Sequence, residues 1–274
     1  MRSPHLAAVI ALAACTSTAP VALTSIASAP RARALPMQPA GALRVMSYNV
    51  NFGIAGDEAA IAAIARARPQ VVFLQETNDV WRDALVRGLP QFPHHAFAPP
   101  EDLPAGGMGV MSMYPIASIE RLPSVGGPFF AQRVVVDAPQ GRVQVLNVHL
   151  RPPMSDGGSW IAGFFTTREV REREMSWHAS RLDPALPTVI LGDFNEEGDG
   201  LALAVTDRLG YTDAIAQWLG KTRTWEWPVG ALTLRFQLDH ILHDARFTAA
   251  AAGIVEAGRS DHKPIWADLE RVEP

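Results

Sequence analysis

Six strand-like stretches of this chain are flanked by a side chain that can bind a metal ion or move a proton, and this recurrence constrains the fold more than any other feature. These side chains are Asn49, Glu76, His149, Asp193 with Asn195, Asp239, and Asp261 with His262. A single carboxylate after a strand is usually a turn residue or a helix cap. Because sites in layered sheets are built at strand ends, the repetition predicts one site where these ends meet.

Predicted strands and helices are interleaved along the chain, and the composition shows no break after residue 42. Apolar runs predict strands at Leu43–Asn49, Val71–Glu76, Gly109–Met113, Val134–Asp137, Arg142–Leu150, Thr188–Asp193, Phe236–Leu242 and Ile265–Leu269. Amphipathic patterns predict helices at Glu58–Arg68 (capped by Asp57), Asn78–Leu89, Arg168–Arg181 and Leu201–Leu209. The interleaving favours one α/β domain in which helices cover sheets.

Two short motifs sharpen the prediction of a site. Gly192-Asp193-Phe194-Asn195 places a carboxylate and an amide two residues apart after an apolar strand, so both side chains can reach one ligand. Ser260-Asp261-His262 places a carboxylate beside an imidazole just before the last predicted strand. The structural alternatives are an Asx turn for the first motif and a helix cap for the second.

Other clusters are interpreted as structural or are left open. His240 follows Asp239 in one predicted strand, so it should face the opposite side of the sheet and pack there. The charged helix at Arg168–Arg181 is interpreted as a helix face with salt bridges along it and not as a basic stripe. Trp225–Pro228 is expected in a loop, either as a lid over the site or in the core. The Gly-rich segment Met154–Phe165 is either an apolar contact for a lipid or a base, or a loop folded onto the core.

The first 42 residues have the composition of an export signal and a tether. Arg2 and the apolar run that follows are typical of a secretory signal, because the run is shorter than the roughly 20 residues that span a bilayer. Leu12-Ala13-Ala14-Cys15 resembles a bacterial lipoprotein signal, which predicts a signal peptide at 1–14 and a lipidated Cys15. Secretion without a lipid, after cleavage at Ala29, is the alternative. Residues 15–42 are then a flexible tether and residues 43–274 the folded domain.

The charge and the cysteine content limit which partners and metal sites the protein can have. With 24 Lys and Arg against 28 Asp and Glu, the net charge is -4, which argues against binding nucleic acid by bulk electrostatics but leaves room for a local basic groove. Cys15 is the single cysteine of the sequence, so there is no intramolecular disulfide and no cysteine metal site. A lipidated Cys15 would hold the protein on a membrane outside the cytoplasm. Thr16 after it resembles the sorting signal for the outer membrane, where a cell has two.

Taken in order, the motifs resemble those of the endonuclease/exonuclease/phosphatase superfamily. The matching segments are Arg44–Val50, Phe73–Glu76, Gly109–Ser112 with Pro115, Asn147–Leu150, Gly192–Asn195, Leu238–Ile241 and Ser260–Pro264. Each segment is weak by itself, but their order and spacing over residues 43–269 are specific. The resemblance implies an α/β fold that is a four-layered sandwich, with two mixed β-sheets flanked by helices (deoxyribonuclease I-like).

The resemblance also implies a metal site. Glu76 would be the primary ligand of Mg²⁺, with Asn49 and Asp261 close to the ion. Carboxylate and amide oxygens suit such a hard cation, and Mn²⁺ or Ca²⁺ could take its place. Asn51 lies where some members of the superfamily carry an Asp beside a second metal ion. An amide there would bind a second cation more weakly.

The remaining residues acquire catalytic roles from the same resemblance. Asp193 and Asn195 would position and activate the attacking water. Asp239 would orient His262, which would stabilise or protonate the phosphate, and His149 would contact the phosphate oxygens. Physical chemistry agrees with this division, because hydrolysis of a phosphodiester needs an oriented water, an acceptor for its proton, and neutralisation of the phosphoryl oxygens.

These inferences predict a Mg²⁺-dependent phosphoesterase that hydrolyses a phosphodiester or phosphomonoester outside the cytoplasm, as a monomer. A phospholipid or a small phosphodiester suits the acidic charge better than a nucleic acid, since a nuclease would present a line of Lys and Arg. The first alternative is an endonuclease or exonuclease acting on extracytoplasmic DNA or RNA. The second is a non-catalytic binding lipoprotein on the same fold.

Overall fold

The computed structural model describes residues 35–154, 158, 163, 166–230 and 232–272. The chain from Leu35 onward forms a compact unit by itself. Cys15, the signal peptide, most of the tether and most of the segment Met154–Phe165 lie outside the described residues. Among the helices that are described, none is both long and apolar enough to cross a membrane.

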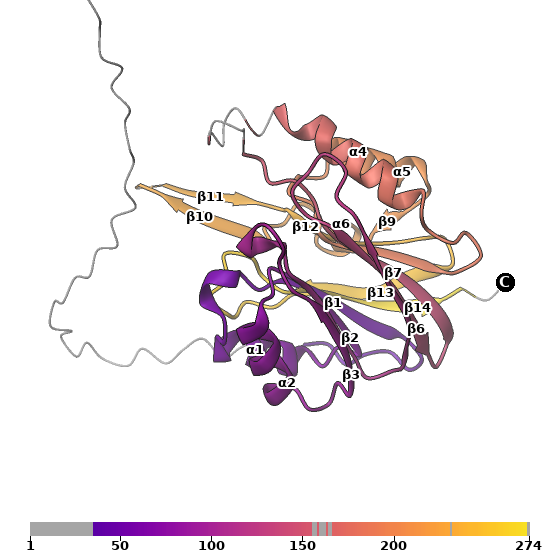
Figure 1. Ribbon diagram of the computed structural model, residues 1–274. Helices are drawn as coiled ribbons and strands as arrows, with labels where there is room; N and C mark the ends of the chain where they lie inside the picture. The colour runs from indigo at the N-terminus through magenta and orange to yellow at the C-terminus, as the bar shows by residue number, and fades with distance from the viewer. Residues whose placement is uncertain (1–34, 155–157, 159–162, 164–165, 231, 273–274) are drawn as a thin grey trace, which may run out of the picture. The chain divides into compact units, whose positions relative to one another are not determined.

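Two six-stranded sheets form the centre of the unit (Figure 1). The first has the order β13 (Phe247–Ile254), β14 (Ile265–Arg271), β1 (Leu43–Asn49), β2 (Val71–Gln75), β4 (Met108–Ser112) and β3 (His94–Ala98). The second has the order β5 (Ile116–Leu122), β6 (Ala131–Ala138), β7 (Gly141–His149), β8 (Thr188–Asp193), β12 (Asp239–His243) and β9 (Thr212–Asp213). Both sheets are mixed, because β1 pairs in parallel with β2 and β7 with β8 while the other pairs are antiparallel.

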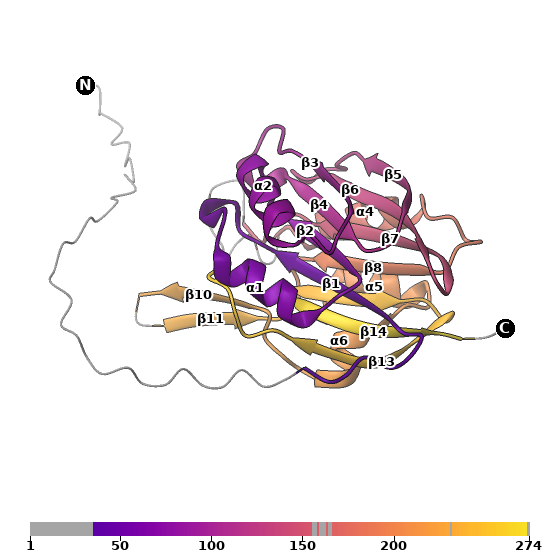
Figure 2. The ribbon, with the colours of Figure 1, turned by 90° about the horizontal axis from the view of Figure 1, so that it is seen from below.

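Helices cover the outer faces of both sheets, so the unit has four layers, seen from a second direction in Figure 2. The described helices are η1 (Phe52–Ile54), α1 (Glu58–Ala67), α2 (Asp79–Gly88), η2 (Pro104–Gly106), α4 (Arg168–Ala179), α5 (Leu201–Arg208) and α6 (Ala214–Leu219). A fully buried cluster that includes Val45 and Val189 fills the space between the sheets. Trp81 of α2 packs on the first sheet and Met175 of α4 on the second. The predicted four-layered α/β sandwich is confirmed.

The central strands of each sheet are buried on both faces, which explains their continuous apolar runs. β1 and β2 run side by side in one direction, as do β7 and β8, so each pair ends at a common edge. β12 starts there as well, because Asp239 is the register partner of Asp193 at the end of β8. The topology therefore brings the polar ends of these strands together.

Several local predictions are corrected by the structure. The strand predicted at Phe236–Leu242 is two strands, β11 (Leu232–Phe236) and β12, separated by Gln237 and Leu238. β13 was not predicted, because its run of alanines has low β-propensity. Trp225–Pro228 lies in a strand, β10 (Trp225–Val229), which pairs with β11 as a separate two-stranded ribbon, whereas the sequence predicted a loop.

The described salt bridges of α4 join it to other elements, whereas the sequence predicted salt bridges along the helix face. Arg171 and Glu174 are fully buried on its inner side. The Arg171 guanidinium pairs with Glu196 of the loop after β8 at 3.0 Å, and Glu174 accepts a hydrogen bond from the backbone of Arg151. Long-range partners, which the spacing along one helix does not reveal, account for the buried charges.

Candidate active site

The backbone at the edge where the strands end adopts a conformation that is rare for residues with side chains. Among the described residues, four other than glycine have a positive φ, and three of them are Asn51 (59°), Glu76 (58°) and Asn195 (53°). The left-handed region is unfavourable for an L-residue, and its local cost is tolerated mainly at functional sites. In the same region, a side chain at Gly192 would place its Cβ 2.0 Å from the carbonyl oxygen of Val148, so glycine is required for β8 to approach β7.

An amide links the first sheet to the second at this edge. The Nδ2 of Asn49, at the end of β1, donates to the Oε1 of Glu76 at 3.0 Å and to the Oδ2 of Asp193 at 3.1 Å. Asn49 is fully buried, and its own Oδ1 accepts from the backbone N–H of Asn51. The structure thus brings together three predicted site residues from β1, the residue after β2, and β8.

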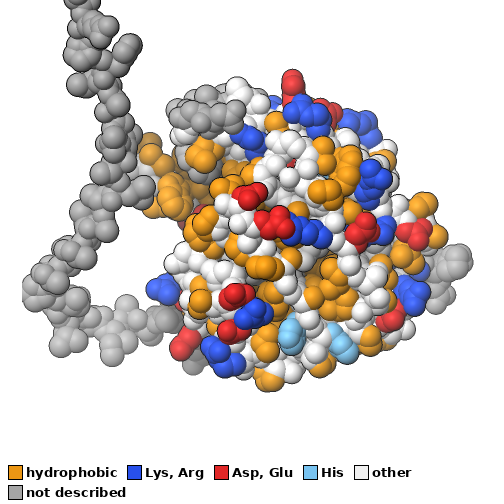
Figure 3. All heavy atoms as spheres, in the orientation of Figure 1, with side chains coloured by type: hydrophobic (Ala, Val, Ile, Leu, Met, Phe, Trp, Pro, Cys, Tyr) orange, Lys and Arg blue, Asp and Glu red, His pale blue; other side chains and the backbone are white. Residues whose placement is uncertain are grey.

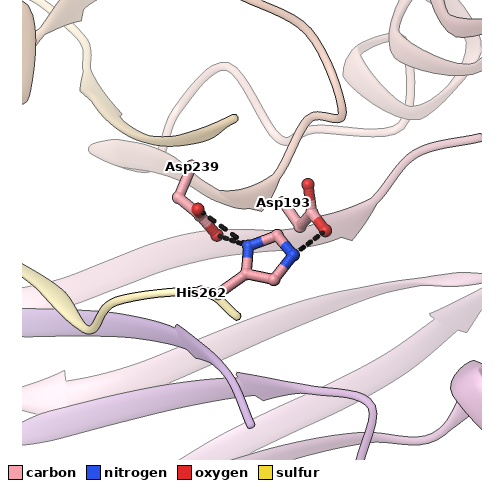
Figure 4. Close-up of side chains that lie close together, drawn as sticks. All are labelled: Asp193, Asp239 and His262. Atoms are coloured by element: carbon pink, nitrogen blue, oxygen red, sulfur yellow. Dashed lines mark hydrogen bonds and ion pairs between the residues drawn. The ribbon is translucent and has the colours of Figure 1, made fainter. Parts of the chain in front are cut away.

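His262 lies between two carboxylates (Figure 4). Its Nδ1 is 2.9 Å from the Oδ2 of Asp239, and its Nε2 is 3.5 Å from the Oδ2 of Asp193. All three side chains are buried. Burial alone would lower the pKa of His262, but Asp239 and Asp193 outweigh it and raise that pKa to about 10, so the imidazole is cationic at neutral pH. Burial raises the pKa of Asp193.

His149 approaches the same oxygen from the end of β7. Its Nε2 is 3.6 Å from the Oδ2 of Asp193, and its ring stacks on Phe129 with the ring centroids 4.0 Å apart. Burial lowers the pKa of His149 to about 3, so this imidazole is neutral at physiological pH. One neutral and one cationic imidazole therefore face Asp193, a difference that was not predicted from the sequence.

Asp261 and Asn51 form a further hydrogen-bonded pair at the site. The Nδ2 of Asn51 donates to one oxygen of Asp261 at 2.9 Å, and the indole Nε1 of Trp225 donates to the other at 2.8 Å. Asn195, the last of the predicted residues, donates through its Nδ2 to the carbonyl of Leu150 at 2.9 Å. Its backbone N–H also binds Asp193, so it fixes that carboxylate in place.

Two groups of side chains have the chemistry of a metal site. The ligand atoms of Asp193, Asp239 and His262 lie within 4.8 Å of one another. However, the Nδ1 of His262 is committed to Asp239, and a protonated imidazole cannot ligate a metal. The other group is centred on Glu76, whose described hydrogen-bond donors are only Asn49 and the backbone of Phe52.

Glu76 fits a divalent cation better. Burial raises the pKa of Glu76, and within the described part of the chain no Lys or Arg is paired with it. A carboxylate in such a place is stabilised by a cation from solution. Asp261 is near enough to raise the pKa of Glu76 further by charge repulsion, and a shared cation would relieve that repulsion.

The eight residues predicted at the strand ends and Asn51 are linked by contacts at this one edge, and three further contacts there were not predicted. Phe129, which precedes β6, stacks on His149. The Oγ1 of Thr224 accepts from the backbone N–H of Asp239 at 3.0 Å. Trp225 belongs to the site, although its sequence context left a lid and a core position equally open. Only the aromatic pair at Phe129 and Phe130 was available in the sequence as a signal for the first contact.

Known structures share this fold. An endonuclease/exonuclease/phosphatase from Beutenbergia cavernae aligns with a TM-score of 0.68 and 22% identity, over 84% of this chain and 72% of that one. TDP2 from C. elegans aligns with a TM-score of 0.64 and 15% identity, over 85% and 76%. TDP2 from D. rerio, solved with a single-strand DNA product, has a TM-score of 0.64 and 17% identity, over 84% and 99%. No curated protein matches the sequence.

The fold is that of the deoxyribonuclease I-like class. The model of the endonuclease/exonuclease/phosphatase family matches residues 46–262, a range that contains all nine of the site residues. The chain belongs to this family.

Proposed function

We propose that this protein is a Mg²⁺-dependent hydrolase of phosphodiesters or phosphomonoesters. One observation carries the proposal: the oxygen of Asp193 that faces His149 and His262 is linked through Asn49 to Glu76. A proton acceptor, two imidazoles and a candidate cation ligand thus surround one space. These are the components that phosphoester hydrolysis requires.

The residues divide the chemistry according to their charge. Asp193 accepts the proton of the attacking water as the new bond from oxygen to phosphorus forms. Its raised pKa suits that role, because a base works best when its pKa is near the working pH. The cationic His262, oriented by Asp239, stabilises negative charge on the phosphoryl group while the bond to the leaving oxygen breaks. Neutral His149 donates a hydrogen bond to a phosphoryl oxygen.

Glu76 and Asp261 would hold the cation, which when bound neutralises charge on the phosphate. Asn49 presents its amide nitrogen to Glu76. We therefore place it as the link between Glu76 and Asp193, while direct ligation by its oxygen would require the amide to turn. Asn51 holds Asp261 and would bind a second cation weakly, as an uncharged ligand. Mn²⁺ or Ca²⁺ would be accepted by the same oxygens.

The test of this function is hydrolysis of bis-p-nitrophenyl phosphate. We expect activity with Mg²⁺, its loss with EDTA, and a fall of about 10³-fold in Glu76→Gln. Glu58→Gln, an exposed carboxylate in α1, is the matched control and should retain activity. Mg²⁺ should also raise the melting temperature of the wild type but not of Glu76→Gln. EDTA-insensitive hydrolysis would exclude the metal, and inactivity under all conditions would favour a non-catalytic binding protein.

A nuclease is the second candidate function. It is favoured by the likeness to D. rerio TDP2, whose structure contains a single-strand DNA product. The charge distribution argues for the smaller substrate, because Lys and Arg are interspersed with Asp and Glu on the face drawn in Figure 3. Parallel assays on single-stranded DNA, plasmid DNA, phosphatidylinositol and sphingomyelin separate the two candidates.

We further propose that the protein is exported and anchored to a membrane through a lipidated Cys15, with secretion as the alternative. The sequence around Cys15 is the support for this proposal. Wild-type protein should partition into the detergent phase of Triton X-114 extracts, whereas Cys15→Ala should remain in the aqueous phase. Equal partitioning of the two proteins would contradict anchoring by this residue.

A further inference from the structure

The ribbon formed by β10 and β11 has one continuous apolar face. Cross-strand partners in it are Trp225 with Phe236, Trp227 with Leu234, and Val229 with Leu232. Alternate residues of a strand share a face, so all six side chains lie on the same side of the ribbon. Trp225 is 4% exposed, Trp227 47% and Leu232 72%, so the face leads from the protein interior to solvent.

The outer half of this ribbon carries no charge on either face. The residues from Trp227 to Leu234 include no Asp, Glu, Lys or Arg. The first charged pair is Glu226 with Arg235, whose side chains are 3.3 Å apart on the opposite face, where the uncharged half begins. A ribbon that laid only one face on a protein partner could keep charges on its other face. Absence of charge on both faces favours immersion in an apolar medium.

Two basic side chains precede the ribbon in the chain. Lys221 and Arg223 are both exposed, and neither forms an ion pair with a described residue. Lys263 is a third basic residue near the base, but it is paired with Glu226 at 3.1 Å and Glu256 at 2.8 Å. An uncharged tip containing Trp next to exposed basic residues is the arrangement expected of a segment that enters an anionic lipid surface.

The base of the ribbon is part of the active-site wall. Trp225 forms a β-bridge with His262 and donates its indole N–H to Asp261. The backbone N–H of Glu226 donates to the carbonyl of Asp261 at 2.9 Å, and that of Lys263 donates to the carbonyl of Thr224 at 2.7 Å. Figures 1 and 2 both show the ribbon projecting beyond the ends of the two large sheets. Whatever the tip enters is therefore held next to the catalytic residues.

We propose that the outer half of the β10–β11 ribbon docks into a phospholipid bilayer and presents lipid headgroups to the active site. The distance from Trp227 to Gly230 is about 10 Å along the strand, which matches the depth of the boundary between headgroups and acyl chains. The ribbon goes no deeper, because among the described strands neither β10 nor β11 has a second neighbour, so the backbone groups on their outer edges must stay near water. The second half of the proposal rests on the phosphoesterase function proposed above, whereas docking does not.

Flotation with vesicles tests docking directly. The protein used is the compact unit that begins at Leu35, because neither Cys15 nor the apolar run before it can then contribute to binding. It also carries Glu76→Ala, so that lipid is not hydrolysed during the experiment. We expect it to float with vesicles of equal parts phosphatidylcholine and phosphatidylglycerol, and less with phosphatidylcholine alone. Trp227→Ser/Leu232→Ser should lower the partition coefficient at least about tenfold, given the apolar area removed. Val229→Asp, a single charge at the tip, should lower it similarly.

The matched control is Val80→Ser/Leu209→Ser, which removes two exposed apolar side chains outside the ribbon and should bind as the parent does. Melting temperatures establish that each variant is folded. Equal flotation of the ribbon variants and their parent would overturn the proposal, as would a parent that does not float. Dimers in lipid-free solution that Val229→Asp abolishes would also overturn it, because the face would then bind a second copy. If the parent docks but the protein with Glu76 intact hydrolyses no lipid, only the proposed lipid substrate is refuted.

Discussion

Two Asp–His pairs lie on opposite faces of β12, which contributes Asp239 to one pair and His240 to the other, and the two pairs differ in their surroundings. His262 contacts Asp239 at 2.9 Å, and His240 contacts Asp213 at 2.7 Å. In both pairs burial opposes the charge on the imidazole and the carboxylate outweighs it, so both histidine pKa values are raised. Asp239 and His240 are adjacent, so they face opposite sides of the sheet as the strand period requires.

The difference lies in the second nitrogen of each ring. The Nε2 of His240 is 3.1 Å from the carbonyl oxygen of Glu196, and the ring meets Phe194 edge-on, so this imidazole has no free position. The Nε2 of His262 faces Asp193 at 3.5 Å, at the edge where the strands end. We therefore interpret the pair at His262 as catalytic, because its far nitrogen faces another residue of the site, whereas the far nitrogen of His240 is bound to a backbone carbonyl.

Replacing the two histidines should give the largest difference in effect between the two pairs. We expect His262→Ala to lower turnover of bis-p-nitrophenyl phosphate by about 10³-fold, because the cation that stabilises the phosphoryl group is lost. His240→Ala should instead lower the melting temperature, since it leaves Asp213 without its partner. Rates and melting temperatures measured for both variants check this. If folded His240→Ala protein were as inactive as His262→Ala, the distinction between a catalytic and a structural pair would be contradicted.

Asp239→Asn should lower turnover by about 10²-fold with little change in fold. The amide no longer supports the cationic form of His262, although it keeps the shape of the contact. Turnover and far-UV circular dichroism of the purified variant are the measurements. Activity near that of the wild type would reject the orienting role of Asp239.

Asp213→Asn is the counterpart on the other side of the sheet. We expect a loss of about 1.5–3 kcal/mol in the free energy of unfolding, because a charged hydrogen bond in a buried pair is weakened. Turnover should stay within about threefold of the wild type, since His240 touches nothing at the site. Urea denaturation gives the stability, and a larger loss of turnover in fully folded protein would place Asp213 among the positioning residues.

The smallest expected effect is a pH dependence of stability. The pKa of His262 is about 10 in the folded protein and near 6.5 in an unfolded chain, so its pairing contributes fully below pH 6.5 and is lost as the pH rises through about 10. The gap in free energy of unfolding between wild type and Asp239→Asn should therefore be largest near pH 6 and shrink toward pH 10. Urea titrations of metal-free protein across that range measure it. A gap that grows with pH would contradict a cationic His262.

Much of the site was predictable because strand periodicity and strand ends are local properties. The runs ending at Asn49 and Asp193 predicted their strands to within a residue, and Asp239 and His240 were correctly assigned to opposite faces. The ribbon was not predicted, because Trp225–Pro228 contains a proline and its partner strand was merged with β12. The buried Arg171 was also missed, since its partner Glu196 lies in a different element.

The sequence by itself determined which residue types stand at the ends of the buried strands, and with them the family and the class of chemistry. Hydrophobic periodicity encodes that information over a few residues at a time. Only the tertiary structure decided that His149 is neutral and His262 cationic, that Asn49 bridges two carboxylates, and that Trp225 joins an exposed apolar ribbon to the site. Those properties depend on burial and on contacts between residues far apart in the chain, so they arise only when the two sheets pack together.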